Sequence, residues 1–179
     1  MKTTFLLIPV FMSALSGPQV AVQGINNKQE EAAHLLGAVV REDLTKIPYK
    51  QWFDAEYDAY KVNEAALDTL GKWLVGVEME IFMGTWCSDS RRDLPRLFKI
   101  LDYLDFPEER VRMVGVDRAK KSPGGEQEGM NIHHVPTIIL YMDDVEVGRI
   151  IESPIHTLED DITAILTGEV YLPNYHEQE

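Results

Sequence analysis

The 179-residue sequence contains a single cysteine, Cys87. One cysteine cannot close a disulfide within the chain, which excludes a disulfide-stapled scaffold. The thiol is therefore either a buried, inert side chain or an exposed group that reacts with thiols and disulfides of other molecules. The residues around Cys87 have to distinguish these two roles.

Basic residues are also scarce. The 17 lysines and arginines face 30 aspartates and glutamates, and the formal net charge is −13. Nucleic acids and anionic membrane surfaces are polyanions that an acidic chain repels. We therefore expect no nucleic-acid partner, and we interpret the charge mainly as a contribution to solubility.

No apolar run is long enough to span a membrane as a helix. Residues 5–15 (FLLIPVFMSAL) are fewer than the roughly 20 needed to cross about 30 Å of hydrocarbon. The run follows Lys2 and ends near the small residues Ala14 and Ser16, as in a secretory signal peptide. We predict a signal peptide over residues 1–16, cut between 16 and 24, and a secreted or periplasmic mature chain that does not span the membrane. A buried N-terminal helix or strand is the alternative.

Hydrophobic periodicity predicts alternating helices and strands. Residues 28–43 fit a helix, 47–60 an aromatic segment that wraps the core, 63–74 a helix capped by Asn63, and 77–83 a strand. A long helix follows Ser88 with Pro95 inside it, then a strand at 111–116 and a polar loop with a possible short helix at 126–130. A strand after Thr137 turns at 143–144 into a strand over 145–151, and a helix over 158–166 ends at Gly168.

This order combines a parallel crossover unit with an antiparallel hairpin, which predicts an α/β fold with a central mixed sheet. The near-continuous apolar runs of the strands indicate helices on both faces. We predict a leader and N-terminal helix extension over residues 17–62, one domain over 63–168 and a tail over 169–179.

Cys87 stands between a buried strand and a helix. Free backbone N–H groups and the helix dipole favour a thiolate there. Arg91 and Arg92 would add to this effect, whereas Asp89 would oppose it. Trp86 either shields the sulfur and contacts an incoming peptide, or is a core residue at a strand end.

Residues 82–101 (FMGTWCSDSRRDLPRLFKIL) resemble the active-site strand, turn and helix of the thioredoxin family, whose motif is Trp-Cys-x-x-Cys. Pro95 and the Val135-Pro136-Thr137 loop match two further family features. The resemblance covers about residues 63–168. It implies a thioredoxin-like fold with a C-terminal hairpin and helix, a cis Pro136 that faces the thiol, and a peptide-binding surface at Trp86, Val135, Pro136 and Thr137.

Two positions depart from the family pattern. Ser90 stands where the family has the second cysteine, and its hydroxyl cannot attack a mixed disulfide. Ile81 stands where the family has a buried acidic residue that helps to move protons. Both losses fall on the resolving half-reaction, so dithiol oxidoreduction by the chain alone is excluded and formation of a mixed disulfide is what remains.

His133 and His134 precede the proline loop, so the resemblance brings one or both toward Cys87. Adjacent residues of an extended segment point to opposite sides, and only one can face the thiol. The histidines are solvent-facing loop residues, or one of them tunes the thiol together with Arg91, or they form a Cys-His-His metal site. We predict no metal and no cofactor.

The sequence leaves three functional hypotheses. In the first, Cys87 attacks disulfides of exported client proteins or low-molecular-weight thiols, with Ser90 as hydrogen-bond partner and Trp86 beside it, and an external thiol releases the product. Isomerisation of client disulfides suits this chemistry best. In the second, the domain is a non-catalytic peptide-binding or chaperone-like module. In the third, the thiol is inert and the domain structural.

Overall fold

The computed structural model describes residues 34–175, so the predicted signal peptide and most of the leader lie outside the described residues. The elements in chain order are β1 (Gly37–Val39), α1 (Arg41–Leu44), α2 (Lys50–Ala59), α3 (Glu64–Trp73), β2 (Val77–Met83), α4 (Ser88–Tyr103), the 3₁₀ turn η1 (Glu108–Arg110), β3 (Val111–Gly115), β4 (Thr137–Met142), β5 (Val145–Ile151) and α5 (Leu158–Thr167). Within these residues no helix has the length and apolar character needed to cross a membrane.

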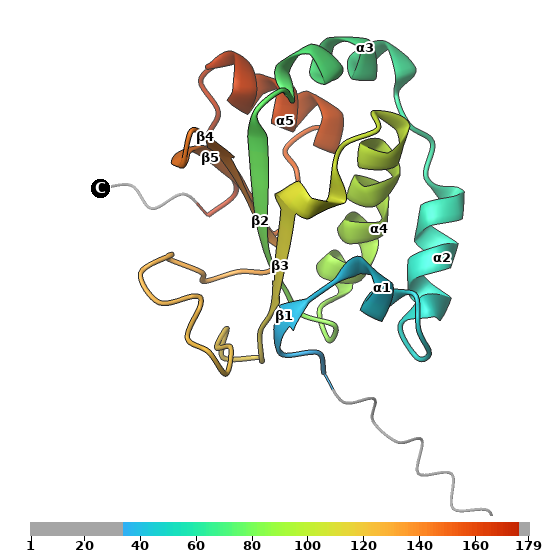
Figure 1. Cartoon of the computed structure of the whole chain (residues 1–179), viewed down its shortest axis with the longest axis vertical. Helices are drawn as coiled ribbons and strands as arrows, with labels where there is room; N and C mark the ends of the chain where they lie inside the picture. Colours follow the sequence, from blue (N-terminus) through green and yellow to red (C-terminus); the bar gives the residue numbers. More distant parts are fainter. Residues whose placement is uncertain (1–33, 176–179) are drawn as a thin grey trace, which may run out of the picture. The chain divides into compact units, whose positions relative to one another are not determined.

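The five strands form one mixed sheet in the order β1-β3-β2-β4-β5 (Figure 1). β2 and β3 are parallel and are joined through α4, whereas β1, β4 and β5 each run antiparallel to their neighbours. The α/β class and the mixed sheet predicted from the sequence are confirmed. β2 and β3 lie inside the sheet, which accounts for the apolar runs that end them.

The two faces of the sheet are covered differently. The odd-numbered residues of β2, such as Met79 and Ile81, join one large core with the apolar side chains of α2, α3, α4 and α5. On the other face, Phe82 joins a small cluster with Val114, Val116, Ile132, Val135 and Ile139, to which no described helix contributes. The expectation of helices on both faces is therefore wrong for residues 34–175. The loop between β3 and β4, residues 117–136, covers the second face instead.

Several boundaries follow from local chemistry as the sequence indicated. The side chain of Asn63 accepts the Ala66 N–H at 3.3 Å and begins α3. Asp143 and Asp144 adopt φ of 50° and 62°, as a two-residue hairpin turn requires. Gly168 ends α5 in the left-handed region with φ 75°. These residues predicted the breaks because each satisfies backbone groups locally.

The predicted helix over residues 28–43 is wrong over residues 34–40, whereas its last residues, 41–43, lie in helix α1. Residues Gly37–Val39 form strand β1, which pairs with β3 through Gly37 and Gly115. The chain passes so close to β3 that a Cβ on Gly115 would lie 2.3 Å from the Leu35 carbonyl oxygen. Tertiary pairing thus overrides a short apolar pattern that also fits a helix.

The aromatic segment 47–60 packs against the core as predicted, and most of it does so as helix α2. Phe53 is buried and contacts Phe98 of α4, with ring centroids 6.1 Å apart. Arg41 of α1 forms a bidentate ion pair with Asp102 of α4, whose carboxylate also accepts the Tyr57 hydroxyl. The N-terminal segment therefore forms a second layer outside α4.

The loop over residues 117–136 has no helix, so the short helix considered at 126–130 is absent there. Four residues of the loop have positive φ, which interrupts helical hydrogen bonding: Lys120, Gly125, Gly129 and Asn131. Arg149 of β5 donates to the Met130 carbonyl at 2.8 Å and anchors the loop to the sheet. A segment held by turns thus replaces a helix beside Cys87.

Candidate functional site

Cys87 is the N-cap residue of α4, at the end of the turn that follows β2. Its backbone N–H donates to the Gly84 carbonyl at 2.9 Å, and its carbonyl accepts the Arg91 N–H at 3.1 Å. The thiol is partly exposed and donates to the Val135 carbonyl oxygen, with Sγ 3.0 Å from that oxygen. The sequence prediction of a thiol at a helix start beside the proline loop is therefore correct in its geometry.

The Val135–Pro136 bond is cis. The Pro136 carbonyl accepts the Glu152 N–H at 2.7 Å, and the Thr137 hydroxyl donates to the His134 carbonyl at 2.8 Å. Val135, Pro136 and Thr137 are all buried. The loop is consequently held from both sides, and its Val135 carbonyl is presented to the sulfur.

Two acidic residues and one basic residue form a charged cluster at the start of α4, beside the thiol. Asp89 Oδ2 lies 4.0 Å from Cys87 Sγ, where its charge opposes a thiolate. Arg92 pairs with Asp89 at 2.7 Å and also with the buried Asp93 at 2.7 Å. Hydrogen bonding to Asp93 raises the pKa of Arg92, so the guanidinium stays charged and offsets both carboxylates.

Arg91 points to a different partner from the one the sequence suggested. Its Nε donates to the Thr85 carbonyl at 2.6 Å, which ties α4 to the turn before Cys87. Ser90 is fully buried, and its Oγ accepts the Gly84 N–H at 3.2 Å. Both residues brace the turn, and Ser90 hydrogen-bonds Gly84 rather than the Cys87 sulfur.

Trp86 combines the two roles considered for it. Its Nε1 donates to the Val116 carbonyl at 2.8 Å, and its ring packs against the small core of the second face. The ring lies on Gly84, where a Cβ would meet Trp86 Cε2 at 2.6 Å. The indole is only half-buried, so it also presents a flat surface beside the thiol.

His133 is exposed and His134 is half-buried. The His134 ring stacks on Tyr175 with centroids 4.0 Å apart and planes 8° apart, and its Nδ1 lies 3.9 Å from a Glu152 carboxylate oxygen. Neither histidine hydrogen-bonds Cys87 within residues 34–175. In that described part of the chain, no three His, Cys, Asp or Glu side chains gather as metal ligands do.

The sequence missed Tyr175, because the tail over residues 169–179 shows no regular pattern. Tyr175 follows Asn174, whose side chain donates to the Ser153 carbonyl at 2.8 Å. A hydrogen bond to Glu152 raises the pKa of the Tyr175 hydroxyl, and the charge of Asp89 adds to that shift. Asp89 and His134 flank the thiol and the proline loop, so the tail reaches the surroundings of Cys87.

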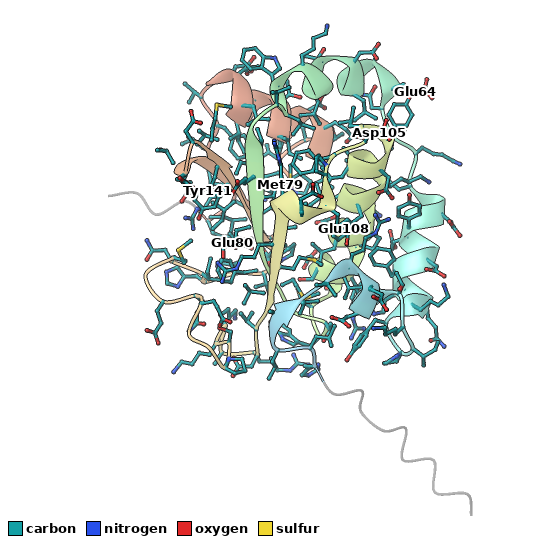
Figure 2. The ribbon with its side chains drawn as sticks, in the orientation of Figure 1. Glu64, Met79, Glu80, Asp105, Glu108 and Tyr141 are labelled. Atoms are coloured by element: carbon teal, nitrogen blue, oxygen red, sulfur yellow. The ribbon has the colours of Figure 1, made fainter. Side chains whose placement is uncertain are left out.

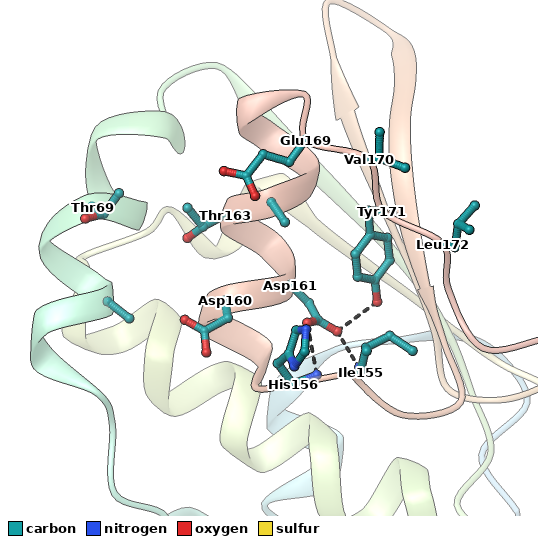
Figure 3. Close-up of a pocket in the computed structure, with 12 residues that line it drawn as sticks. Thr69, Ile155, His156, Asp160, Asp161, Thr163, Glu169, Val170, Tyr171 and Leu172 are labelled. Atoms are coloured by element: carbon teal, nitrogen blue, oxygen red, sulfur yellow. Dashed lines mark hydrogen bonds between the residues drawn. The ribbon is translucent and has the colours of Figure 1, made fainter.

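Two cavities lie away from Cys87. One of about 440 Å³ lies between α3, α5 and the tail (Figure 3). There the buried Asp161 carboxylate accepts hydrogen bonds from the Ile155 and His156 N–H groups and from the Tyr171 hydroxyl. The oxygens of this carboxylate are therefore already bonded to groups of the chain. The other, about 390 Å³, lies on the sheet face where Tyr141 donates to Glu80 at 3.4 Å (Figure 2). Neither cavity includes a residue of the thiol site.

The comparisons with known proteins establish the fold class and nothing finer. No protein-family model matches the chain, and no curated protein matches it significantly. A crystal structure of a protein of unknown function from Pseudomonas aeruginosa is similar, with 14% identity, a TM-score of 0.50, and coverage of 66% of this chain and 84% of that chain. An HIV epitope-scaffold aligns at 16% identity over 67% of this chain and 88% of its own, with a TM-score of 0.33. The first similarity supports a shared α/β fold.

Proposed function

We propose that this chain is an exported, thioredoxin-like monothiol protein that forms mixed disulfides through Cys87. Its substrates would be disulfides of exported client proteins or of low-molecular-weight thiols. The observation that carries the proposal is the position of the sulfur: it caps the start of α4 and lies 3.0 Å from the carbonyl oxygen that precedes the cis proline. The strand order β1-β3-β2-β4-β5, with β4 and β5 after that proline, agrees with such a fold.

The reaction begins when the thiol leaves the Val135 carbonyl and loses its proton to solvent. The Cys87 sulfur attacks one sulfur of a client disulfide, and a Cys87–client disulfide forms while the other client sulfur leaves as a thiolate that takes up a proton. The client, which now carries a free thiol, can then attack the mixed disulfide with that thiol or with another of its own. A new client disulfide forms and Cys87 regains its thiol, so isomerisation needs no outside oxidant or reductant.

The residues around the sulfur support attack on a client disulfide, but none of those named here can release the client from the mixed disulfide. Ser90 is buried and committed to the Gly84 N–H, and it carries no thiol. Ile81 is also buried, and Asp93, which is buried on α4, is paired with Arg92. The second half-reaction therefore depends on a thiol that the client or a small molecule supplies.

The alternative, a non-catalytic peptide-binding module, draws on the same hydrogen bond. A thiol that donates to the Val135 carbonyl is protonated and partly shielded, which would suit a surface that binds a peptide without reacting. In that case the partly exposed surface at Trp86 would bind client peptides equally well after Cys87 is replaced by serine. The two functions differ in whether Cys87 forms and releases a mixed disulfide with the client.

The test is the refolding of a secreted protein with scrambled disulfides, in a glutathione buffer, with wild type and Cys87→Ser compared. The proposal predicts that wild type accelerates recovery of native disulfides and that Cys87→Ser does not. It also predicts a client adduct at Cys87 that a reductant removes, visible by mass spectrometry. Equal refolding by both proteins, with no adduct, would favour the binding module instead.

A further inference from the structure

Two cations of the loop over residues 117–136 lie against the tryptophan that precedes Cys87. Arg118 Cζ is 5.1 Å and Lys120 Nζ 5.8 Å from the centroid of the Trp86 ring, within the range of cation–π attraction. The ring itself is fixed by its hydrogen bond to Val116 and by its contact with Gly84. The positions of both cations relative to the thiol segment are therefore defined.

The backbone of the loop holds these two side chains in place. Asp117 Oδ1 accepts the N–H groups of Ala119 at 2.8 Å and Lys121 at 2.9 Å, and the Lys120 N–H donates to the Asp117 carbonyl at 2.9 Å. Lys120 adopts a left-handed φ of 60°. The tight turn brings residues two apart in sequence onto the same ring.

The charges of Arg118 and Lys120 are not neutralised within residues 34–175. Neither forms an ion pair there, whereas Arg92 pairs with Asp89 and Asp93, and Arg149 pairs with Glu146. Arg118 is exposed and Lys120 is half-buried. In a chain of net charge −13, two adjacent cations that no carboxylate pairs form a local attractor for an anion.

We propose that Arg118, Lys120 and Trp86 form a carboxylate-binding subsite, through which the thiol selects disulfides that carry a carboxylate near the reacting sulfur. This inference rests on the proposed function and names its substrate class. An arginine guanidinium binds a carboxylate through paired N–H groups, and lysine adds a second positive charge. The carboxylate belongs to a small anionic disulfide or to an acidic residue beside a client cysteine.

The test compares two chromogenic disulfides of similar reactivity: dithionitrobenzoate, whose rings carry carboxylates, and dithiodipyridine, which has none. Their second-order rates with the full chain are measured at low ionic strength for wild type and for Arg118→Gln/Lys120→Gln. The subsite predicts that the double substitution slows the carboxylate reagent roughly tenfold, since two nearby charges are lost. The neutral reagent should change less than about twofold, and salt near 0.5 M should remove most of the difference.

The matched control is Lys61→Gln/Lys72→Gln, which removes the same charge. Lys72 lies in α3, which precedes β2, whereas Cys87 follows the other end of that strand (Figure 1). The control should leave both rates within about twofold, because the substituted charges are screened over that distance. An equal loss in the control, or no loss in the Arg118 and Lys120 variant, would overturn the subsite.

The outcomes also separate this inference from the proposed function. If wild type reacts with dithiodipyridine faster than N-acetylcysteine does but shows no preference for the carboxylate reagent, the subsite fails and the function stands. If wild type reacts with neither reagent faster than N-acetylcysteine, both fail.

Two further substrates distinguish the sources of the carboxylate. One is oxidised glutathione, and the other is a cystine-bridged peptide pair that differs only by Glu or Gln beside the cysteine. Slowing by Arg118→Gln/Lys120→Gln with glutathione alone assigns the subsite to small disulfides, and slowing with the Glu peptide assigns it to clients. Slowing with neither substrate overturns the subsite.

Discussion

The two faces of the sheet differ in what covers them. On one face, α3, α4 and α5 bury a continuous apolar core, with α2 packed outside α4. On the other, a loop held by turns contributes Ile132 and Val135 to a cluster of six buried side chains, and the remaining surface is polar, with Glu80 and Tyr141 in contact. The thiol lies where the two meet: α4 begins at Cys87, and the cis proline closes the loop.

The two faces contribute to different properties of the protein: the helical face mainly to stability, and the loop face to the surroundings of the thiol. Most of the apolar surface is buried on the helical face, so it supplies most of the hydrophobic free energy of folding. The loop face supplies the Val135 carbonyl that the thiol contacts and the two cations that lie over the Trp86 ring. Substitutions on the two faces should therefore have different consequences, and four experiments can sharpen or break the comparison.

The largest effect is expected on the helical face. Leu97 of α4 is fully buried, and Leu97→Ala should lower the free energy of unfolding by about 2–5 kcal/mol because it leaves a cavity. Ile132 of the loop face is 7% exposed, and Ile132→Ala should cost about 2 kcal/mol, the low end of the same range, since its surroundings can relax. Urea unfolding measures both, and equal losses would break the comparison.

The next effect concerns the missing second thiol. Ser90→Cys replaces a buried hydroxyl that accepts the Gly84 N–H with a weaker acceptor, so the reduced protein should lose about 1 kcal/mol of stability. The variant should gain catalysis of insulin reduction by dithiothreitol, because a second thiol now releases the mixed disulfide. Ser88→Cys, at an exposed position of the same turn, is the control and should gain little. A Ser90→Cys protein without activity would contradict the proposed thioredoxin-like function.

A smaller effect concerns the ion pair between α1 and α4. Burial alone raises the pKa of Asp102, but hydrogen bonds from Arg41 and Tyr57 outweigh it and lower the pKa. A carboxyl whose folded pKa is lowered stabilises the fold above its ordinary pKa near about 4 and loses this contribution as the pH falls through the folded pKa.

Asp102→Asn should therefore cost about 0.5–1 kcal/mol at neutral pH, because the carboxylate is partly exposed and its charge is screened. Urea unfolding at several pH values should show this difference shrink toward acid pH. Asp68→Asn, at an exposed site of α3, should be neutral throughout. A difference for Asp102→Asn that grew toward acid pH would contradict the assignment.

The smallest effect concerns the tail. Tyr175→Ala removes the ring stacked on His134, a contact worth about 0.5–1 kcal/mol, and should speed reaction of Cys87 with a peptide disulfide about two- to fivefold. The rate of reaction with dithiodipyridine, a small reagent, should not change. Tyr103→Ala, at an exposed aromatic on the far end of α4, provides the control. A slower peptide reaction would mean that Tyr175 contacts the peptide rather than covering its site.

The sequence predicted those elements whose ends are encoded locally. Asn63, the aspartates at 143–144 and Gly168 each satisfy or redirect the backbone where they stand, so the pattern alone places α3, the hairpin and the end of α5. Strand β1 was missed because its three residues depend on pairing with β3. The sequence did not predict that a loop, and not helices, covers the second face of the sheet. Apolar runs indicate that a strand is buried, but not which element buries it.

The same division holds for the site. Cys87 and the Val135–Pro136 loop were predicted because their spacing resembles a known motif, and the structure brings them within 3.0 Å. Ser90 and Arg91 were predicted to act on the sulfur, but their side chains hydrogen-bond backbone groups of the turn. Arg118, Lys120 and Tyr175 reach the site from segments without a regular pattern, so only the folded chain relates them to it.

The central claim is that the position of Cys87 makes its sulfur reactive toward disulfides. The direct test is the second-order rate of mixed-disulfide formation with dithiodipyridine at neutral pH, for wild type and for Cys87→Ser/Ser88→Cys, which moves the single thiol by one residue to an exposed site. We predict that wild type reacts at least about tenfold faster than both this variant and N-acetylcysteine, since only the thiol at the N-cap position lies beside the proline loop. Equal rates for all three thiols would contradict the claim.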